Sequence, residues 1–228
     1  FFIVAYAITL VLIFNWHRLV RRFGKKNVFL GNLLVKALVV LMLANLSPHK
    51  GQATAVRAVA ELKARGVNVS CWMAGVEREP GAVFTAKLQD MIVSAGLSQD
   101  VRLLGFRNDA PALLRAADVM LLPSTHEGLP LTIVEAQATK VPVIAAATAG
   151  VPEVIRDGHT SFLVSADDAR GYADRIEQLL RSPSDHTAMI EDAYRQATTV
   201  YYWERCRDRI CELYGEIAER RLAARKAG

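Results

Sequence analysis

The stretch LLPSTHEGLPLTIVEAQATKVPVIAAATAGVPEVIRD, residues 121–157, leads from a short apolar run through a loop into a segment with helical spacing. The apolar run at 119–122 favours a buried strand, and Pro123 ends it. Pro130 fits the first turn of a helix, where an amide hydrogen would lack a partner. The residues that then repeat at helical spacing, and that we expect to be buried, are Leu131, Val134 and Ala138.

Two acidic residues frame the start of this expected helix. Glu127 lies in the loop, and Glu135 lies little more than one turn into the helix, on the face of Leu131. Both can face the crevice at the carboxyl ends of strands, where open α/β sheets bind ligands. Because carboxylates repel phosphate, we expect them to hold sugar hydroxyls, while helix amides here or near residues 150–153 receive an anion. A solvated loop acid and an ordinary exposed helix residue remain the alternative.

The pattern extends beyond the two acids. The segments PSTHEGLPLTIVEA, VPVIAAATAGVPEVIRDG and SFLV, with LLGFRNDAPALLRAADVMLLPS and SPHKG before them, lie within residues 38–164. Together they resemble the donor-sugar motif of the retaining GT-B glycosyltransferases of the family 4 group, whose hallmark is two glutamates with seven residues between them. Glu127 and Glu135 have this spacing.

The resemblance implies the nucleotide-sugar-binding half of a glycosyltransferase, which moves a hexosyl unit from a nucleoside diphosphate sugar to an acceptor alcohol with retention. It implies bacterial polysaccharide or glycolipid synthesis, with a glycan or glycolipid as acceptor. No cofactor and no metal are implied, because cationic side chains and helix amides would stabilise the departing diphosphate. A truncated or non-catalytic nucleotide-sugar-binding module and a sugar-nucleotide epimerase are the alternatives.

The resemblance also implies roles for individual residues. The catalytic residues would be Glu127, which holds donor sugar hydroxyls, and Lys50, which binds the diphosphate. Glu135 would bind the ribose. Asn45 stands where the family has an arginine, so it offers hydrogen bonds without charge. The other substrate-binding residues implied are Gly105 and Phe106, beside the nucleobase, and Gly128, Leu129, Pro130 and Leu131.

Two positions depart from the family pattern. Gly150 and Glu153 match its GGxPE segment, but Ala149 replaces the first glycine. Lys140 stands where relatives usually have a glycine, just after the expected helix. A side chain is tolerable there if this residue does not adopt the left-handed conformation.

Strands alternate with helices through most of the chain. The expected strands cover residues 38–44, 67–74, 101–104, 119–122, 141–146 and 161–164. The expected helices cover residues 52–65, 84–95, 111–116 and 169–180, the segment after 130, and a short start near 151. This alternation predicts a doubly wound, Rossmann-like parallel sheet. Residues 195–225 predict a basic helix with a packing face at Trp203, Ile210, Leu213, Ile217 and Leu222.

The start of the chain has a different character. Residues 1–14 are uncharged and apolar, and Trp16 and a cationic run at 18–26 follow. This order resembles the cytoplasmic end of a membrane span, although a full span needs about 20 residues. A soluble or buried segment is the other interpretation. We therefore divide the chain into an apolar and basic segment at 1–27, a nucleotide-sugar-binding domain at 28–200 and a basic helix at 201–228. We expect the protein to be cytoplasmic, at the cytoplasmic face of a membrane.

Composition sets further limits. Lys and Arg number 28 against 23 Asp and Glu, and no nucleic-acid-binding motif accompanies this small excess. The three cysteines have no disulfide or metal-ligand spacing, which predicts a reducing compartment and no structural metal. A chain of 228 residues holds one sizeable domain with an appendage, so we do not expect an acceptor-binding domain within it.

Overall fold

The computed structural model describes residues 38–226, with side chains as far as residue 221. The membrane anchor predicted at 1–27 lies outside the described residues. Within the described part, none of the helices combines the length and apolar character that a membrane crossing needs.

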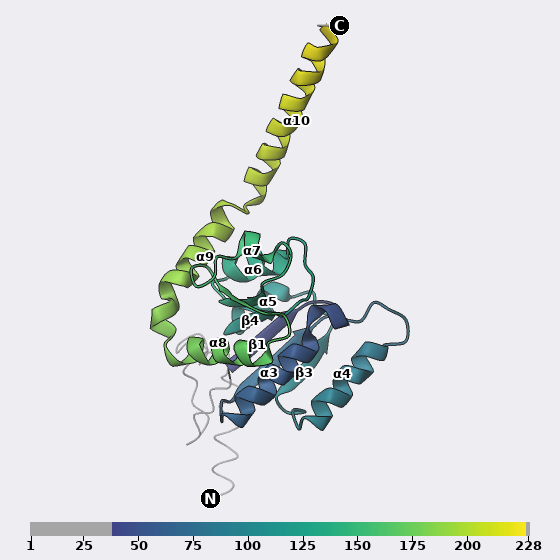
Figure 1. The fold of residues 1–228 in the computed structure, drawn as a ribbon, viewed down its shortest axis with the longest axis vertical. Helices are drawn as coiled ribbons and strands as arrows, with labels where there is room; N and C mark the ends of the chain where they lie inside the picture. Colours follow the sequence, from purple (N-terminus) through teal and green to yellow (C-terminus); the bar gives the residue numbers. More distant parts are fainter. Residues whose placement is uncertain (1–37, 227–228) are drawn as a thin grey trace, which may run out of the picture. The chain divides into compact units, whose positions relative to one another are not determined.

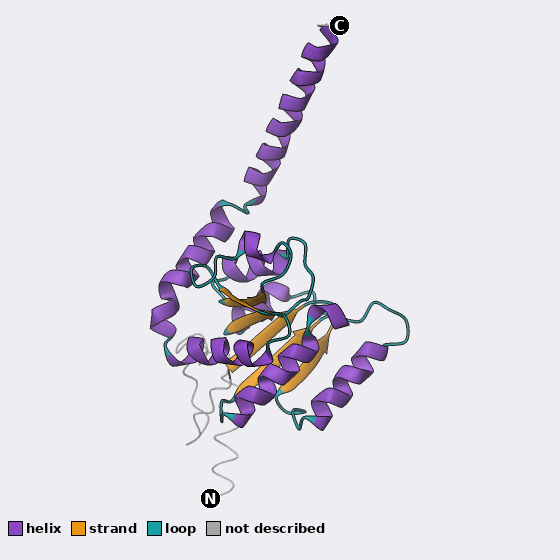
Figure 2. Ribbon diagram, in the orientation of Figure 1, coloured by secondary structure: helices purple, strands orange, loops and turns teal. Residues whose placement is uncertain are grey.

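Six parallel strands within residues 38–226 form one sheet, in the order β3-β2-β1-β4-β5-β6 (Figures 1 and 2). The strands are β1 (Leu38–Leu43), β2 (Val69–Ala74), β3 (Val101–Gly105), β4 (Val119–Leu122), β5 (Val143–Ala146) and β6 (Phe162–Val164). From β1 in the middle of the sheet, the described part of the chain builds one half outward to β3 and then the other half from β4 to β6. This order confirms the predicted doubly wound, Rossmann-like sheet.

Helices cover both faces of the sheet (Figure 1). One face carries α3 (Gln52–Ala64), α4 (Val83–Ser94) and α8 (Ala169–Arg181), and the other carries α5 (Ala110–Ala116), α6 (Leu131–Ala138) and α7 (Val151–Val154). The central strand β1 shows why two cores form. Val40 and Met42 belong to the first core and Leu41 to the second, because successive side chains of a strand point to opposite faces.

Within residues 38–181, the predicted strands and most predicted helices end within two residues of the observed ones. The prediction of one helix over 195–225 is wrong in its start, because α9 (Thr187–Thr199) and α10 (Trp203–Lys226) are separate helices. Short 3-10 turns, η1 (Pro48–Lys50) and η2 (Pro183–His186), complete the described elements. At the break, Tyr201 packs against the second core and its hydroxyl donates to the Glu153 carbonyl at 3.3 Å.

The packing face predicted for α10 is exposed in this chain. Trp203, Ile210, Leu213 and Ile217 have exposed fractions of 69, 49, 40 and 51 %. No residue from 203 to 221 is buried. The side chain of Leu222 lies outside the described residues. The predicted carboxy-terminal helix is therefore present, but the described residues do not cover its apolar face.

Helix α6 buries a different stripe from the one predicted. Its buried residues are Ile133, Ala136 and Gln137. Leu131 is 63 % exposed and Ala138 is exposed as well, so the prediction that they belong to the core face is wrong, whereas Val134 is half-buried and packs against the second core. Two apolar stripes share this short helix, and spacing alone does not decide between them. Because Ile133 faces the core, Glu135 lies on the exposed side with Leu131.

The end of α6 bears on the expectation for Lys140. The helix closes with a Schellman motif, in which the Val141 amide donates to the Ala136 carbonyl at 2.9 Å. This motif requires a left-handed residue, and Lys140 has φ 58°, so the condition under which we expected a side chain to be tolerated here is not met. The Lys140 Nζ lies 2.6 Å from Glu191 Oε1 and 4.7 Å from the centre of the Tyr194 ring. These contacts with α9 help to offset the strain of the left-handed backbone.

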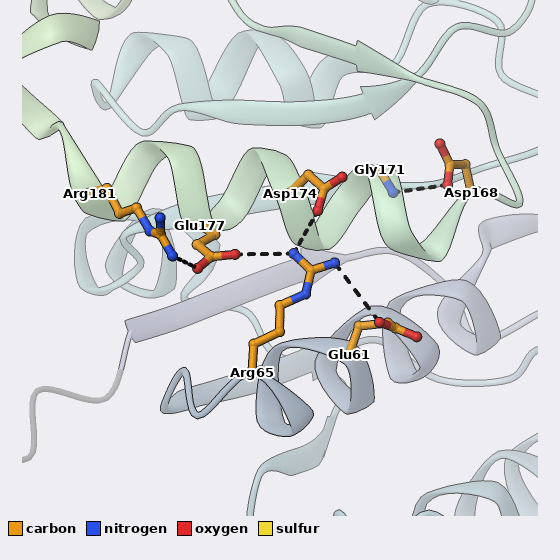
Figure 3. Close-up of polar contacts among 7 residues, drawn as sticks. All are labelled: Glu61, Arg65, Asp168, Gly171, Asp174, Glu177 and Arg181. Carbon is orange, nitrogen blue, oxygen red and sulfur yellow. Dashed lines mark hydrogen bonds and ion pairs between the residues drawn. The ribbon is translucent and has the colours of Figure 1, made fainter.

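A group of charged side chains links α3 to α8 (Figure 3). The Nη1 of Arg65, at the end of α3, lies 2.6 Å from Asp174 Oδ1 and 3.1 Å from Glu177 Oε2. Glu177 also pairs with Arg181 on the same helix. Pairs with this much solvent exposure contribute little to stability individually, so the apolar core beneath them holds α3 and α8 together.

Lys140 allows a direct test of backbone strain. Lys140→Gly and Lys140→Ala both remove the contacts with Glu191 and Tyr194, but only glycine relieves the left-handed strain. We expect the glycine variant to be more stable than the alanine variant by about 1 kcal/mol. Urea unfolding of the two variants measures this difference, and equal free energies of unfolding would show that no strain resides at this position.

Candidate functional site

The order of the strands creates a switch point between β1 and β4. The loop after β1 leads to α3 on one face of the sheet, and the loop after β4 leads to α6 on the other face. A crevice opens where neighbouring loops diverge in this way, and open α/β sheets bind their ligands there. Lys50 lies on the first of these loops and Glu127 on the second.

Lys50 and Glu127 meet across the switch point. The Lys50 Nζ lies 2.8 Å from Glu127 Oε1. The exposed fraction is 28 % for the lysine side chain and 11 % for the glutamate side chain, so water screens this pair much less than a surface pair. The alternative in which Glu127 is a solvated loop acid is therefore excluded.

Backbone contacts hold these two loops together. The Thr125 amide donates to the His49 carbonyl at 2.9 Å. Gly51 has φ 73° and approaches the other loop so closely that a β-carbon would lie 2.1 Å from the Pro123 carbonyl oxygen. A side chain at this position would push the loops apart, and the ion pair depends on their close approach.

The loop after β5 packs against the same place. The Gly150 amide donates to the Glu127 carbonyl at 3.3 Å, and a β-carbon on Gly150 would lie 2.1 Å from the Gly128 carbonyl oxygen. Ala149, which replaces a glycine of the family motif, has φ 44° and adopts the left-handed conformation. Glu153 follows in α7, and its side chain is exposed.

A pocket of about 570 Å³ opens beside Lys50, between the loops after β1 and β2 and the first turns of α4. Asn45 and Lys50 both line it, so the two residues predicted to bind phosphate share one cavity. Gln52 is 1 % exposed, and its Nε2 donates to the Asn45 carbonyl at 2.8 Å, which fixes the start of the loop. Arg78 and Lys87 also line the pocket, and neither has an ion-pair partner among the described residues.

Three of these residues, Gln52, Arg78 and Lys87, were not predicted from the sequence. The burial of Gln52 carries no signal in the sequence, because a polar residue in the first turn of a helix is normally read as exposed. The two cations carry no signal either. They lie in and after a loop whose path past Lys50 follows from the tertiary structure alone.

The helix starts around the pocket differ in their capacity for an anion. At α4, the Glu77 carboxylate accepts the Thr85 amide at 2.8 Å and the Phe84 amide at 3.0 Å. The hydrogen bond from Thr85 is the main cause that lowers the pKa of Glu77, so this carboxylate stays ionised and occupies the helix start. The starts of α3, α6 and α7 have no side-chain cap. At α7, however, the amides of Gly150, Val151 and Glu153 donate to backbone carbonyls, and Pro152 has no amide hydrogen. The predicted anion site at residues 150–153 is therefore occupied by backbone contacts, whereas the starts of α6 and α3 remain open.

Glu135, which was predicted to bind the ribose, and two of the predicted substrate-binding residues before it face solvent. The Glu135 carboxylate has no hydrogen-bond or ion-pair partner among the described residues. Leu129 and Leu131 are 53 and 63 % exposed, whereas Pro130 is buried as the residue before α6. This exposed face is open to a ligand that lies along the start of the helix.

The residues predicted to lie beside the nucleobase end β3. The Gly105 carbonyl accepts the Gly75 amide at 2.9 Å, and Gly105 has φ 65°. Phe106 is 75 % exposed, and Arg107 forms an ion pair of 2.6 Å with Asp109 just after it. The structure thus brings Asn45, Lys50, Glu127 and Gly128 together, while no hydrogen bond or ion pair among the described residues joins Glu135 or Phe106 to that group.

This sheet order, with a cation and a carboxylate at the switch point and a pocket beside them, forms a Rossmann-like domain, and its similarity to known glycosyltransferases assigns it to the GT-B type. Residues 27–196 match the model of the family described as glycosyl transferases group 1, and the chain belongs to that family. Among the described residues, no group of His, Cys, Asp and Glu side chains has the arrangement of a metal site.

Similar proteins of known sequence are also named as glycosyltransferases. The chain is 32 % identical to a D-inositol 3-phosphate glycosyltransferase of Corynebacterium efficiens, over 79 % of this chain and 43 % of the relative. It is 34 % identical to the protein of that name from Mycobacterium tuberculosis, over 77 % of this chain and 36 % of the relative. The chain thus spans less than half the length of these relatives.

Solved structures agree with the fold. Anabaena Alr3699/HepE in complex with UDP and glucose matches with a TM-score of 0.74 and 27 % identity, over 78 % of this chain and 48 % of that one. The carboxy-terminal domain of the group 1 glycosyl transferase LpcC from Francisella tularensis matches with a TM-score of 0.65 and 25 % identity, over 72 % of this chain and 86 % of that one. These matches favour a domain of the glycosyltransferase family over the epimerase.

Two glycines test the close approach of the loops. Gly51 and Gly66 have nearly equal φ values of 73° and 74°, but no atom lies within 4 Å of a β-carbon built on Gly66. We expect Gly66→Ala to lower the free energy of unfolding by about 1 kcal/mol through left-handed strain. Gly51→Ala should lower it by about 1 to 3 kcal/mol more, because its β-carbon collides with Pro123. Urea unfolding measures both, and equal losses would show that the loops adjust freely.

Proposed function

We propose that this chain provides the donor-binding half of a retaining glycosyltransferase, which transfers a hexosyl unit from a nucleoside diphosphate sugar to an acceptor alcohol. The Lys50–Glu127 pair at the switch point is the observation that carries this proposal. It holds a group suited to an anion and a group suited to hydroxyls within 2.8 Å of each other. The similar Anabaena structures contain UDP with glucose, or UDP-glucose, which supports a uridine diphosphate sugar as the first donor to test.

Each part of the donor has a group to receive it in this proposal. Lys50 and the first amides of α3 bind the diphosphate, with Asn45 as an uncharged donor in the same pocket. Glu127 accepts hydrogen bonds from the sugar hydroxyls, and residues 128–131 line the donor beside it. Glu135 binds the ribose, and the loop at Gly105 and Phe106 contacts the base.

The chemistry follows from where charge develops. The bond between the anomeric carbon and a diphosphate oxygen breaks, which leaves positive charge on the sugar ring and negative charge on the diphosphate. Lys50 and the amides of α3 stabilise that negative charge, so the proposal needs neither a metal nor a cofactor. The oxygen of the acceptor hydroxyl then forms the new bond to the anomeric carbon, and its proton passes to the departing diphosphate.

The acceptor is a glycan or glycolipid in this proposal. The relatives are named for D-inositol 3-phosphate, which is an alcohol, and this supports a hydroxyl group as the acceptor. The apolar residues 1–14 and the cations at 18–26 support a location at the cytoplasmic face of a membrane. Polysaccharide or glycolipid synthesis fits such a location.

Lys50→Ala tests the diphosphate site. The variant should bind UDP about 10- to 100-fold more weakly than the wild type, which corresponds to the loss of a charge-assisted hydrogen bond, but should bind uridine equally well. Lys63→Ala is the matched control, because Lys63 pairs with Asp100 at 2.7 Å in another part of the domain. Calorimetric titration decides the matter, and equal losses for UDP and uridine would remove Lys50 from the diphosphate site.

Glu135→Ala tests the ribose site. Because UDP and uridine share the ribose, we expect both to lose affinity by the same factor, equivalent to about 1 to 3 kcal/mol. The urea midpoint should not change, since Glu135 is exposed and has no partner to lose. A lower midpoint with unchanged affinity for both ligands would show that Glu135 has a structural role instead.

A further inference from the structure

The single positive charge of Lys50 can pair with either the Glu127 carboxylate or a bound diphosphate, but not fully with both. In the free protein it pairs with Glu127 at 2.8 Å, and in the proposed function, on which this inference rests, it binds the diphosphate. We infer that the Glu127 carboxylate competes with the diphosphate for Lys50, and that this competition makes the site prefer a nucleotide sugar to the nucleoside diphosphate left after transfer.

The surroundings of Glu127 make the competition unequal. Its side chain is 11 % exposed, and Lys50 is its sole side-chain partner among the described residues. A ligand that takes Lys50 away therefore leaves a largely buried carboxylate without a counter-charge. Breaking such a pair is strongly unfavourable, because water cannot replace the lost partner.

A nucleotide sugar avoids this loss and a nucleoside diphosphate does not. The sugar carries hydroxyl groups that donate to Glu127 while the diphosphate takes Lys50, so both residues keep a partner. A nucleoside diphosphate offers nothing to Glu127. Its phosphates must draw Lys50 away from a carboxylate that has no replacement, and its affinity falls accordingly.

The same competition assists product release. When the sugar has moved to the acceptor, Glu127 loses its hydroxyl donors and Lys50 becomes its nearest available partner. The ion pair then forms again, and the cation that held the diphosphate is withdrawn. Glu127 thus acts on both the selection of the donor and the departure of the product.

Glu127→Gln tests this inference, because glutamine keeps the size of the side chain and removes its charge. We expect the variant to bind UDP about tenfold more tightly than the wild type, with no change for uridine. The ratio of UDP-glucose affinity to UDP affinity should fall by about the same factor. Calorimetric titration with these three ligands provides the readout, and melting temperature reports whether the variant remains folded.

Two further variants serve as controls. Asp100→Asn breaks the Lys63–Asp100 pair, which has a similar length of 2.7 Å, and should leave UDP affinity unchanged. In a Lys50→Ala background, Glu127→Gln should no longer tighten UDP binding, because the cation for which Glu127 and the diphosphate compete is absent. Glu127→Asp, whose shorter side chain holds Lys50 less closely, should tighten UDP binding by less than glutamine does, and it replaces the glutamine variant if that variant unfolds.

The outcomes separate this inference from the proposed function. A folded Glu127→Gln variant that binds UDP no more tightly than the wild type overturns the inference, as does equal tightening in the presence and absence of Lys50. Adenosine and guanosine diphosphates are titrated in parallel with UDP. If the wild type binds none of the three, or if Lys50→Ala leaves their affinity unchanged, the proposed function itself fails.

Discussion

The close approach of two backbone segments, Gly51 and Pro123, is the constraint on which the rest of the site depends. These residues belong to different βα units, and the sheet order makes their loops neighbours at the switch point. With no β-carbon between the loops, Lys50 and Glu127 can reach each other. A second contact of the same kind, between Gly150 and Gly128, fixes the Glu127 loop from the other side. Backbone packing therefore sets the geometry of the charged groups.

The fold was largely predictable because short apolar strands alternate with amphipathic helices, and this alternation has few solutions other than a parallel sheet. The errors lie where local periodicity is ambiguous. Helix α6 carries two apolar stripes, and contact with the sheet selects Ile133 over Leu131. Lys140 adopts a conformation that favours glycine, because the Schellman motif demands it and α9 supplies partners for the side chain. Neither outcome follows from the neighbouring sequence alone.

The site was predictable in its members but not in their contacts. The motif identified Lys50 and Glu127 as binding residues with separate tasks. Their ion pair joins positions 77 apart in the chain, and only the tertiary structure shows it. The same holds for Arg78 and Lys87, whose loop passes the pocket because β2 lies beside β1. Gln52 was missed for a different reason, since a polar residue in a helix start is normally read as exposed.

The pairing of Lys50 with Glu127 also affects how fast an anionic ligand arrives. At distances greater than the separation within the pair, the two charges cancel, and Lys50 attracts a phosphate only at contact. The field that reaches into solvent around the pocket comes from charges on its rim that have no ion-pair partner among the described residues, of which Arg78 and Lys87 are positive and Glu77 and Glu79 are negative. Exposed side chains therefore steer the encounter with a dianion. Salt screens their electrostatic field beyond a Debye length of about 8 to 10 Å near physiological ionic strength, and more strongly as the salt concentration rises. The rate of association and the strength of the final complex are governed by different residues.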